Sequence, residues 1–83
     1  MKPENLLEQW DEFIAQRALP YYIDSHQLMM RQVLNRFPVG KLGDLSDVDL
    51  AETVHSESER SFSYFLNHFQ RFLSIHDLDR QFR

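Results

Sequence analysis

Residues 58–78 read SERSFSYFLNHFQRFLSIHDL, and this stretch decides the fold. It holds four of the seven Phe residues and contains neither Gly nor Pro. Aromatic side chains recur at the three- and four-residue spacing of one helical face, at Phe62, Phe65, Phe69, Phe72 and His76. Leu66 and Leu73 widen that face, so the apolar stripe is broader than a narrow coiled-coil seam. Such a helix must be covered on more than one side, and we expect the rest of the chain to cover it.

Three further helices are predicted before this one, and prolines mark where two of them start. Pro3 suits the first helical position, because its missing N–H would have no intrahelical partner there. Leu19 and Pro20 end the first helical pattern, because the residue before a proline is disfavoured in the helical conformation. The predicted helices lie at about residues 3–17, 20–36, 47–55 and 58–75, within one domain of residues 1–83.

The connection between the second and third helices is predicted to be a linker over residues 37–43, which hold a proline and both glycines of the chain. We expect Leu42 and Leu45 to pack into the core from this side of the molecule. Ser46, with an acidic residue three positions later, predicts a capping box at the start of the third helix. Residues 56–59, Ser-Glu-Ser-Glu, repeat the capping signature before the Phe-rich helix.

An apolar face is visible on each of the first three helices. Trp10 is interpreted as a core anchor, with an exposed partner-binding aromatic as the alternative. Met29 and Met30 are interpreted as gap-filling core residues rather than as a cofactor surface. The third helix is expected to bury four residues, Val48, Leu50, Ala51 and Val54. With only two Gly and three Pro for turns, the chain is predicted to be all-α: a compact four-helix orthogonal bundle with the Phe-rich C-terminal helix in the centre.

Charge is unevenly distributed along the chain. The net charge is −4, and residues 42–59 carry six acidic groups and no Lys or Arg. Residues 60–83 carry four Arg against two Asp. Non-specific binding to a phosphate backbone usually needs a basic surplus, so the overall charge disfavours nucleic acid unless one face is locally basic. The acidic run is interpreted as a solvated face, with a docking surface for a basic partner as the alternative.

No catalytic, cofactor or metal motif can be recognised. The absence of Cys excludes disulfides and thiolate metal sites and is compatible with the cytoplasm, where we expect the protein. The four His lack the spacing of a metal site, and Gly40 and Gly43 match no phosphate loop. No signal peptide or membrane-length apolar run is visible. We therefore expect no enzyme activity, no cofactor, no small-molecule substrate and no membrane contact.

Four segments, one from each predicted helix, share a pattern with a known family. The first, residues 7–13, is an L-x-x-W-x-x-F segment, and residues 42–50, LGDLSDVDL, are similar to a Thr-Pro-Glu-Asp-Val helix start. The second segment places Leu19-Pro20 before Tyr22, His26, Met30, Leu34 and Phe37; the fourth places Ser58 and Ser61 before Leu66, Phe69, Phe72 and Leu73. Together they resemble the N-terminal core-binding (SAM-like) domain of tyrosine recombinases and phage integrases. The chain departs from that family at Tyr64, where members usually carry Arg or Lys, and it contains no recombinase catalytic domain.

The resemblance implies binding of double-stranded DNA, mainly through its backbone. The residues expected to contact DNA are Arg31, Asn35, Arg36, Lys41, Arg60, Ser61, Ser63, Asn67 and Arg71. The chain would then be the binding domain of a recombinase or, alternatively, a separate helical protein with the same pattern.

The second hypothesis is a small acidic interaction module, for example a dimeric regulator or adaptor, with no nucleic-acid role. The motivation is the net charge and an aromatic excess on the last helix beyond what three short helices can cover. The expected partner-binding residues are Phe62, Tyr64, Phe65, Phe69, Phe72 and Phe82.

Overall fold

The computed structural model describes residues 3–54 and 58–78. In those ranges the chain forms helices α1 (Pro3–Arg17), α2 (Pro20–Arg36), α3 (Asp47–Thr53) and α4 (Glu59–Ile75), with a short 3₁₀ turn, η1 (Val39–Lys41), and no strand. The all-α prediction is confirmed. The predicted bounds of α1 and α2 agree with the structure, and α4 begins one residue later than predicted.

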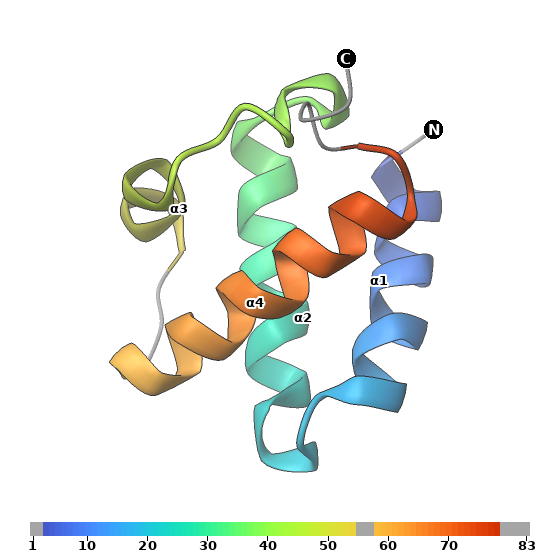
Figure 1. The fold of residues 1–83 in the computed structure, drawn as a ribbon, viewed down its shortest axis with the longest axis vertical. Coiled ribbons are helices and arrows are strands. Elements are labelled where there is room, and N and C mark those ends of the chain that lie inside the picture. The colour runs from blue at the N-terminus through green and yellow to red at the C-terminus, as the bar shows by residue number, and fades with distance from the viewer. Residues whose placement is uncertain (1–2, 55–57, 79–83) are drawn as a thin grey trace.

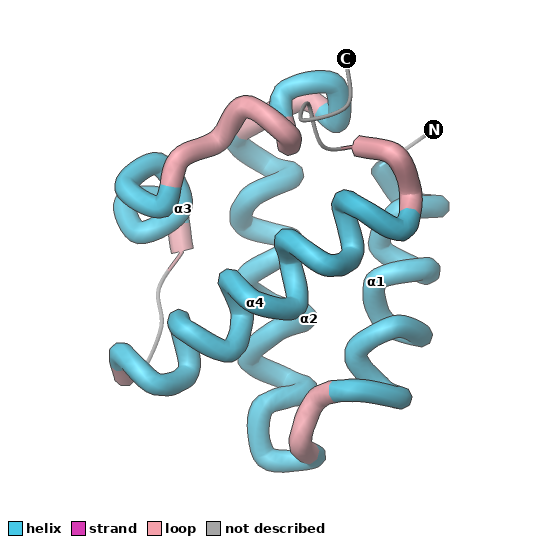
Figure 2. The backbone as a smooth tube through the Cα atoms, viewed as in Figure 1, coloured by secondary structure: helices cyan, strands magenta, loops and turns pink. Residues whose placement is uncertain are grey.

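The helices are arranged as a hairpin crossed by a third rod. Figure 1 shows α1 and α2 running in opposite directions, with α4 passing obliquely across both of them. Helix α3 lies to one side, between the loop that leaves α2 and the start of α4. Figure 2 shows how short the connection between α1 and α2 is. Because α4 crosses both members of the hairpin, its Phe-rich face can be covered by α1 and α2 together.

Trp10 lies at the centre of the core and has no solvent-exposed area. Its ring meets the edges or faces of Phe65 and Phe72 at centroid distances of 5.7 and 5.2 Å. Its indole Nε1 donates a 3.0 Å hydrogen bond to the backbone carbonyl of His26. This bond satisfies the only polar atom of the indole ring inside the core. Trp10 is therefore the core anchor that the sequence predicts, and it ties α1 to both α2 and α4.

The core as a whole is formed by residues from every helix and from the linker. The buried apolar set is Leu6, Trp10, Phe13, Ile14, Ala18, Met29, Met30, Val33, Leu42, Leu50, Val54, Phe65, Phe69, Phe72 and Leu73. The prediction for the linker is confirmed, because Leu42 is buried and Leu45 is partly buried against the core.

Helix α3 buries fewer of its apolar residues than the sequence predicts. It ends at Thr53, and the predicted last residue, His55, lies outside the described residues. The predicted four-residue apolar face is wrong in half of its members, because Val48 is 64% exposed and Ala51 is also exposed. A helix of two turns can turn only one narrow stripe to its neighbour, and Leu50 and Val54, four residues apart, occupy that stripe.

Both predicted serine caps are present. The Ser46 hydroxyl accepts a hydrogen bond from the Asp49 N–H (3.1 Å), and the Asp49 carboxylate accepts one from the Ser46 N–H (3.0 Å). This is the reciprocal pattern of a capping box, and it holds the pKa of Asp49 below its usual range. Ser58 caps α4 by accepting from the Ser61 N–H at 3.1 Å.

The C-terminal end of α4 is closed by a left-handed residue. Asp77 has φ of 55°, and the Leu78 N–H donates to the Leu73 carbonyl at 2.8 Å. The Asp77 N–H donates to the Ser74 carbonyl at 3.2 Å. These two bonds form the Schellman arrangement that commonly ends an α-helix, with an Asp at the position where Gly is usual.

Candidate interaction surfaces

The residues predicted to contact DNA are not all available for that contact. Arg31 and Asn35 are exposed on α2, and they follow the buried His26 by five and nine residues. At about 100° per residue, they point about 140° and 180° away from it around the helix. They therefore lie outside the buried stripe of α2, on the side of the helix that also carries Asp24 and Leu28.

Two other members of that set have contacts within the chain. The Arg36 guanidinium donates to the Thr53 hydroxyl at 3.0 Å and lies 5.2 Å from the centre of the Phe37 ring. Ser61 is only 3% exposed, and its hydroxyl lies 3.1 Å from the hydroxyl of Ser25. A buried hydroxyl with a partner cannot reach a phosphate, so Ser61 is a packing residue in this fold.

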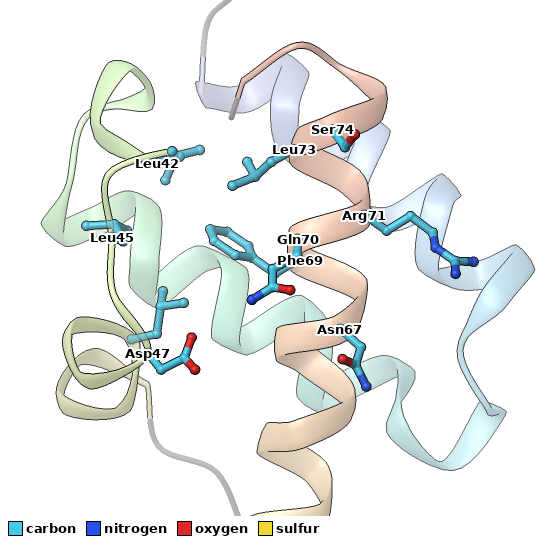
Figure 3. A pocket seen from close by; sticks show the side chains of 11 residues that line it. Leu42, Leu45, Asp47, Asn67, Phe69, Gln70, Arg71, Leu73 and Ser74 are labelled. Carbon is cyan, nitrogen blue, oxygen red and sulfur yellow. The ribbon is translucent and has the colours of Figure 1, made fainter. Parts of the chain in front are cut away.

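The α4 members of the set lie along the outer side of that helix. Exposed side chains are found at Arg60, Ser63, Asn67 and Arg71, and Lys41 is exposed at the end of η1. Figure 3 shows Asn67 and Arg71 beside a groove between α4, the linker and α3. The acidic side chain of Asp47 lies on the opposite side of that groove. The Arg71 side chain extends away from Asp47 in this view, and Arg60 does not line this groove, so the groove does not collect the cations of α4.

This groove between α3 and α4 has a volume of about 670 Å³ but offers little apolar surface. Leu42, Leu50, Phe69 and Leu73 form its floor, and each is at most 5% exposed. A ligand placed there would contact mainly the polar rim, because the floor is already withdrawn from water.

A second groove, which we call the α2–α4 groove, has exposed apolar walls. It has a volume of about 750 Å³ and is lined by Tyr21, Tyr22, Asp24, Ser25, Leu28, Ser58, Arg60 and Ser61. Tyr21 is 80% exposed and Leu28 is 52% exposed. Tyr64 of α4 is 38% exposed, and its ring contacts Tyr22 edge to face at a centroid distance of 5.1 Å. The groove thus combines exposed aromatic and aliphatic side chains with one acidic and one basic residue.

The local sequence explains why these α2 residues share one wall. Tyr21, Asp24 and Leu28 are spaced by three and four residues, as is Ser25 with respect to Tyr21 and Leu28, so they lie on one side of the helix. The buried stripe of α2 runs through His26, Met29, Met30 and Val33. An apolar pair at Tyr21 and Leu28 outside that stripe was visible in the sequence, but its significance depends on the polar residues around it.

The aromatic residues expected to bind a partner are largely inside the protein. Phe65, Phe69 and Phe72 are at most 2% exposed, and Phe62 is partly buried against the core. They are buried because α4 crosses two helices, α1 and α2. Together these helices cover more of the aromatic surface of α4 than the interaction-module hypothesis assumed. Tyr64 alone in this set is substantially exposed, and Phe82 lies outside the described residues.

Sequence reasoning missed one pair of side chains, His26 and His68. Their ring nitrogens Nε2 and Nδ1 lie 3.2 Å apart, although the residues are 42 positions apart in the chain. His26 is completely buried, and its Nδ1 has no hydrogen-bond partner at good geometry. The pair borders a small cavity of about 220 Å³, which Arg17, Leu19, Tyr22 and Tyr64 also line.

Burial makes both imidazoles poor bases. Burial, and after it the neighbouring His68, lower the pKa of His26 to about 4, although hydrogen bonds to the backbone of Tyr64 and Tyr22 act in the opposite direction. The pKa of His68 is also lowered, first by burial and then by the positive charges of Arg71 and Arg17. At neutral pH the pair is uncharged, with one ring donating a hydrogen bond to the other.

The described residues provide no metal site and no membrane-spanning helix, and comparison with known proteins adds no candidate site. Within residues 3–54 and 58–78, no three His, Asp or Glu side chains lie close enough together to hold a metal ion. None of the helices in those ranges has the length and apolar character that crossing a bilayer requires. No protein-family model, curated protein or solved structure gives a significant match to this chain.

Proposed function

We propose that this chain is a small helical protein–protein interaction module that binds a protein partner through the α2–α4 groove. The observation that supports it is the exposure of Tyr21 and Leu28 on the same wall of this groove. Tyr is enriched at protein interfaces because it buries a large apolar ring and keeps a polar tip. The Tyr21 ring contacts the Tyr22 ring edge to face at a centroid distance of 5.1 Å, yet the side chain stays 80% exposed.

The groove also has the polar character of a recognition surface. Asp24 and Arg60 are both exposed and line it from α2 and α4. Interfaces typically surround an apolar centre with charged and polar residues, which select the partner and its orientation. The α3–α4 groove lacks this combination, because its apolar residues are already buried.

DNA binding stays a prediction from the sequence resemblance, and the geometry supports it less well. Of its proposed contacts, Ser61 is buried and Arg36 is bonded to Thr53. The net charge of −4 gives no general attraction to phosphates.

Site-specific photo-crosslinking tests the proposal. Benzoylphenylalanine would replace Tyr21 in one variant and Lys41, which is exposed at the end of η1 and does not line the groove, in a control. Both would be expressed in cells that produce the protein naturally. We expect discrete protein adducts from position 21 and none from position 41, and loss of the position-21 adducts when Leu28→Asp is added.

Three results would overturn the proposal. Position 21 could give no adduct, it could give the same adducts as position 41, or its adducts could disappear on nuclease treatment. Far-UV circular dichroism of each purified variant would establish that the helices are retained.

A further inference from the structure

The α2–α4 groove carries two opposite charges on its two walls, Asp24 on α2 and Arg60 on α4. Both side chains are exposed, and neither forms an ion pair with another residue in the part of the chain that the structure describes. Resting on the proposed function, we propose that the partner is a second copy of this chain, bound groove to groove in a twofold-symmetric dimer.

Twofold symmetry imposes a specific requirement that this groove meets. In such a dimer each surface faces a rotated copy of itself, so a residue i that contacts j in the partner is matched by j contacting i. A groove with charges of one sign would repel its own copy. With Asp24 on one wall and Arg60 on the other, a twofold axis that runs along the groove places Asp24 opposite the partner's Arg60, and Arg60 opposite the partner's Asp24. The charge pattern is therefore complementary to itself.

The apolar residues of the groove complete the interface. Tyr21 and Leu28 are two helical turns apart on the same side of α2, so they form an apolar strip along that wall. In the dimer this strip would lie against α4 of the second copy, where Tyr64 is exposed. A standard stable interface buries about 800 Å² on each partner, which is about 15% of the 5490 Å² surface of this chain.

Charge exchange between the walls gives a sharp test. Sedimentation equilibrium of the 83-residue chain at micromolar concentrations would measure self-association of the wild type and of the variants Asp24→Arg and Arg60→Asp. We expect the wild type to dimerise. Each variant should associate at least about tenfold more weakly, because each places two like-charged contacts in the symmetric interface.

Mixing the two variants should restore association. In an equimolar mixture we expect a heterodimer, because the arginine introduced at position 24 of one variant faces the aspartate introduced at position 60 of the other. At the second contact of the heterodimer, the unchanged Arg60 of the first variant faces the unchanged Asp24 of the second. Both contacts then pair opposite charges, as in the wild-type dimer.

The design separates a specific contact from a general charge effect. Asp24→Arg makes the protein less acidic and Arg60→Asp makes it more acidic, yet both should weaken the dimer. Lys41→Asp, at the exposed end of η1 and outside the lining of the groove, makes the same charge change as Arg60→Asp and should leave dimerisation unchanged. Thermal unfolding followed by circular dichroism would confirm that each variant is folded.

Each remaining outcome contradicts the dimer. A monomeric wild type would overturn it, and so would a mixture that fails to restore association. If the wild type is monomeric but position 21 still crosslinks to a protein of different mass, the interaction module stands and its partner is another chain. If position 21 gives no adduct and the wild type is monomeric, both proposals fail.

Discussion

The buried His26–His68 pair predicts that mild acid weakens the fold. Unfolded His titrates near pH 6.5, whereas burial lowers the pKa of His26 in the folded protein to about 4. Between these values the unfolded chain binds a proton that the folded chain excludes, so stability falls as the pH is lowered. The loss of unfolding free energy is absent well above pH 6.5, grows as the pH falls through that value and is complete below about pH 4. His68 acts in the same direction, because its pKa is also lowered.

The expected size of this effect follows from the two pKa values of His26. A difference of about 2.5 units corresponds to about 3 kcal/mol when titration is complete. At about pH 5 the unfolded side chain is nearly fully protonated, and the loss from His26 alone is about 2 kcal/mol. Such a loss is a large part of the stability of a small domain.

Urea unfolding at about pH 7.5 and about pH 5 would measure the loss. The fluorescence of Trp10, the single and fully buried tryptophan, reports unfolding. His26→Gln removes the titrating group while its amide can still bond to His68, so its stability should fall by about 2 kcal/mol less than that of the wild type. His76→Gln leaves the pair intact and serves as the control. Equal losses in the wild type and His26→Gln would refute the assignment of the effect to the buried imidazole.

Three further predictions concern the core and the helix ends. Phe69→Ala should lower the free energy of unfolding by about 3–5 kcal/mol, whereas Val48→Ala, at an exposed site, should change it by less than about 0.5 kcal/mol; urea unfolding of the two variants checks this. Ser46→Ala should cost about 1 kcal/mol through loss of the α3 cap, and an unchanged urea midpoint would contradict that role. Asp77→Gly should raise the unfolding free energy by about 0.5–1 kcal/mol, because its positive φ favours Gly, and a lower melting temperature would show that the Asp side chain contributes more than the strain costs.

The sequence was a good guide to the helices because their signals are local. Pro20 starts α2, and Pro38 follows its last turn, where Phe37 adopts an extended conformation with φ of −125°. Ser46 and Ser58 cap the helices that follow them. Each of these signals acts within a few residues, so it can be recognised without knowledge of the tertiary structure.

The candidate sites were harder to predict because they depend on helix packing. His26 and His68 are far apart in sequence and meet only because α4 crosses α2 at that point. The same crossing buries Ser61 against Ser25. Helical periodicity gives the face on which a residue lies, but it does not tell which neighbouring helix covers that face.

The two sides of helix α4 have different roles. Residues on its outer side can therefore be substituted to test binding without disrupting the core. Its inner side holds Phe65 and Phe72 against Trp10, so substitutions there change stability first. Its outer side carries Arg60 and Tyr64, which are exposed and make few contacts on which the core depends. Surface variants of this kind usually change stability by less than about 0.5 kcal/mol. A loss of association in Arg60→Asp with unchanged stability would therefore locate binding at the α2–α4 groove rather than reflect damage to the bundle.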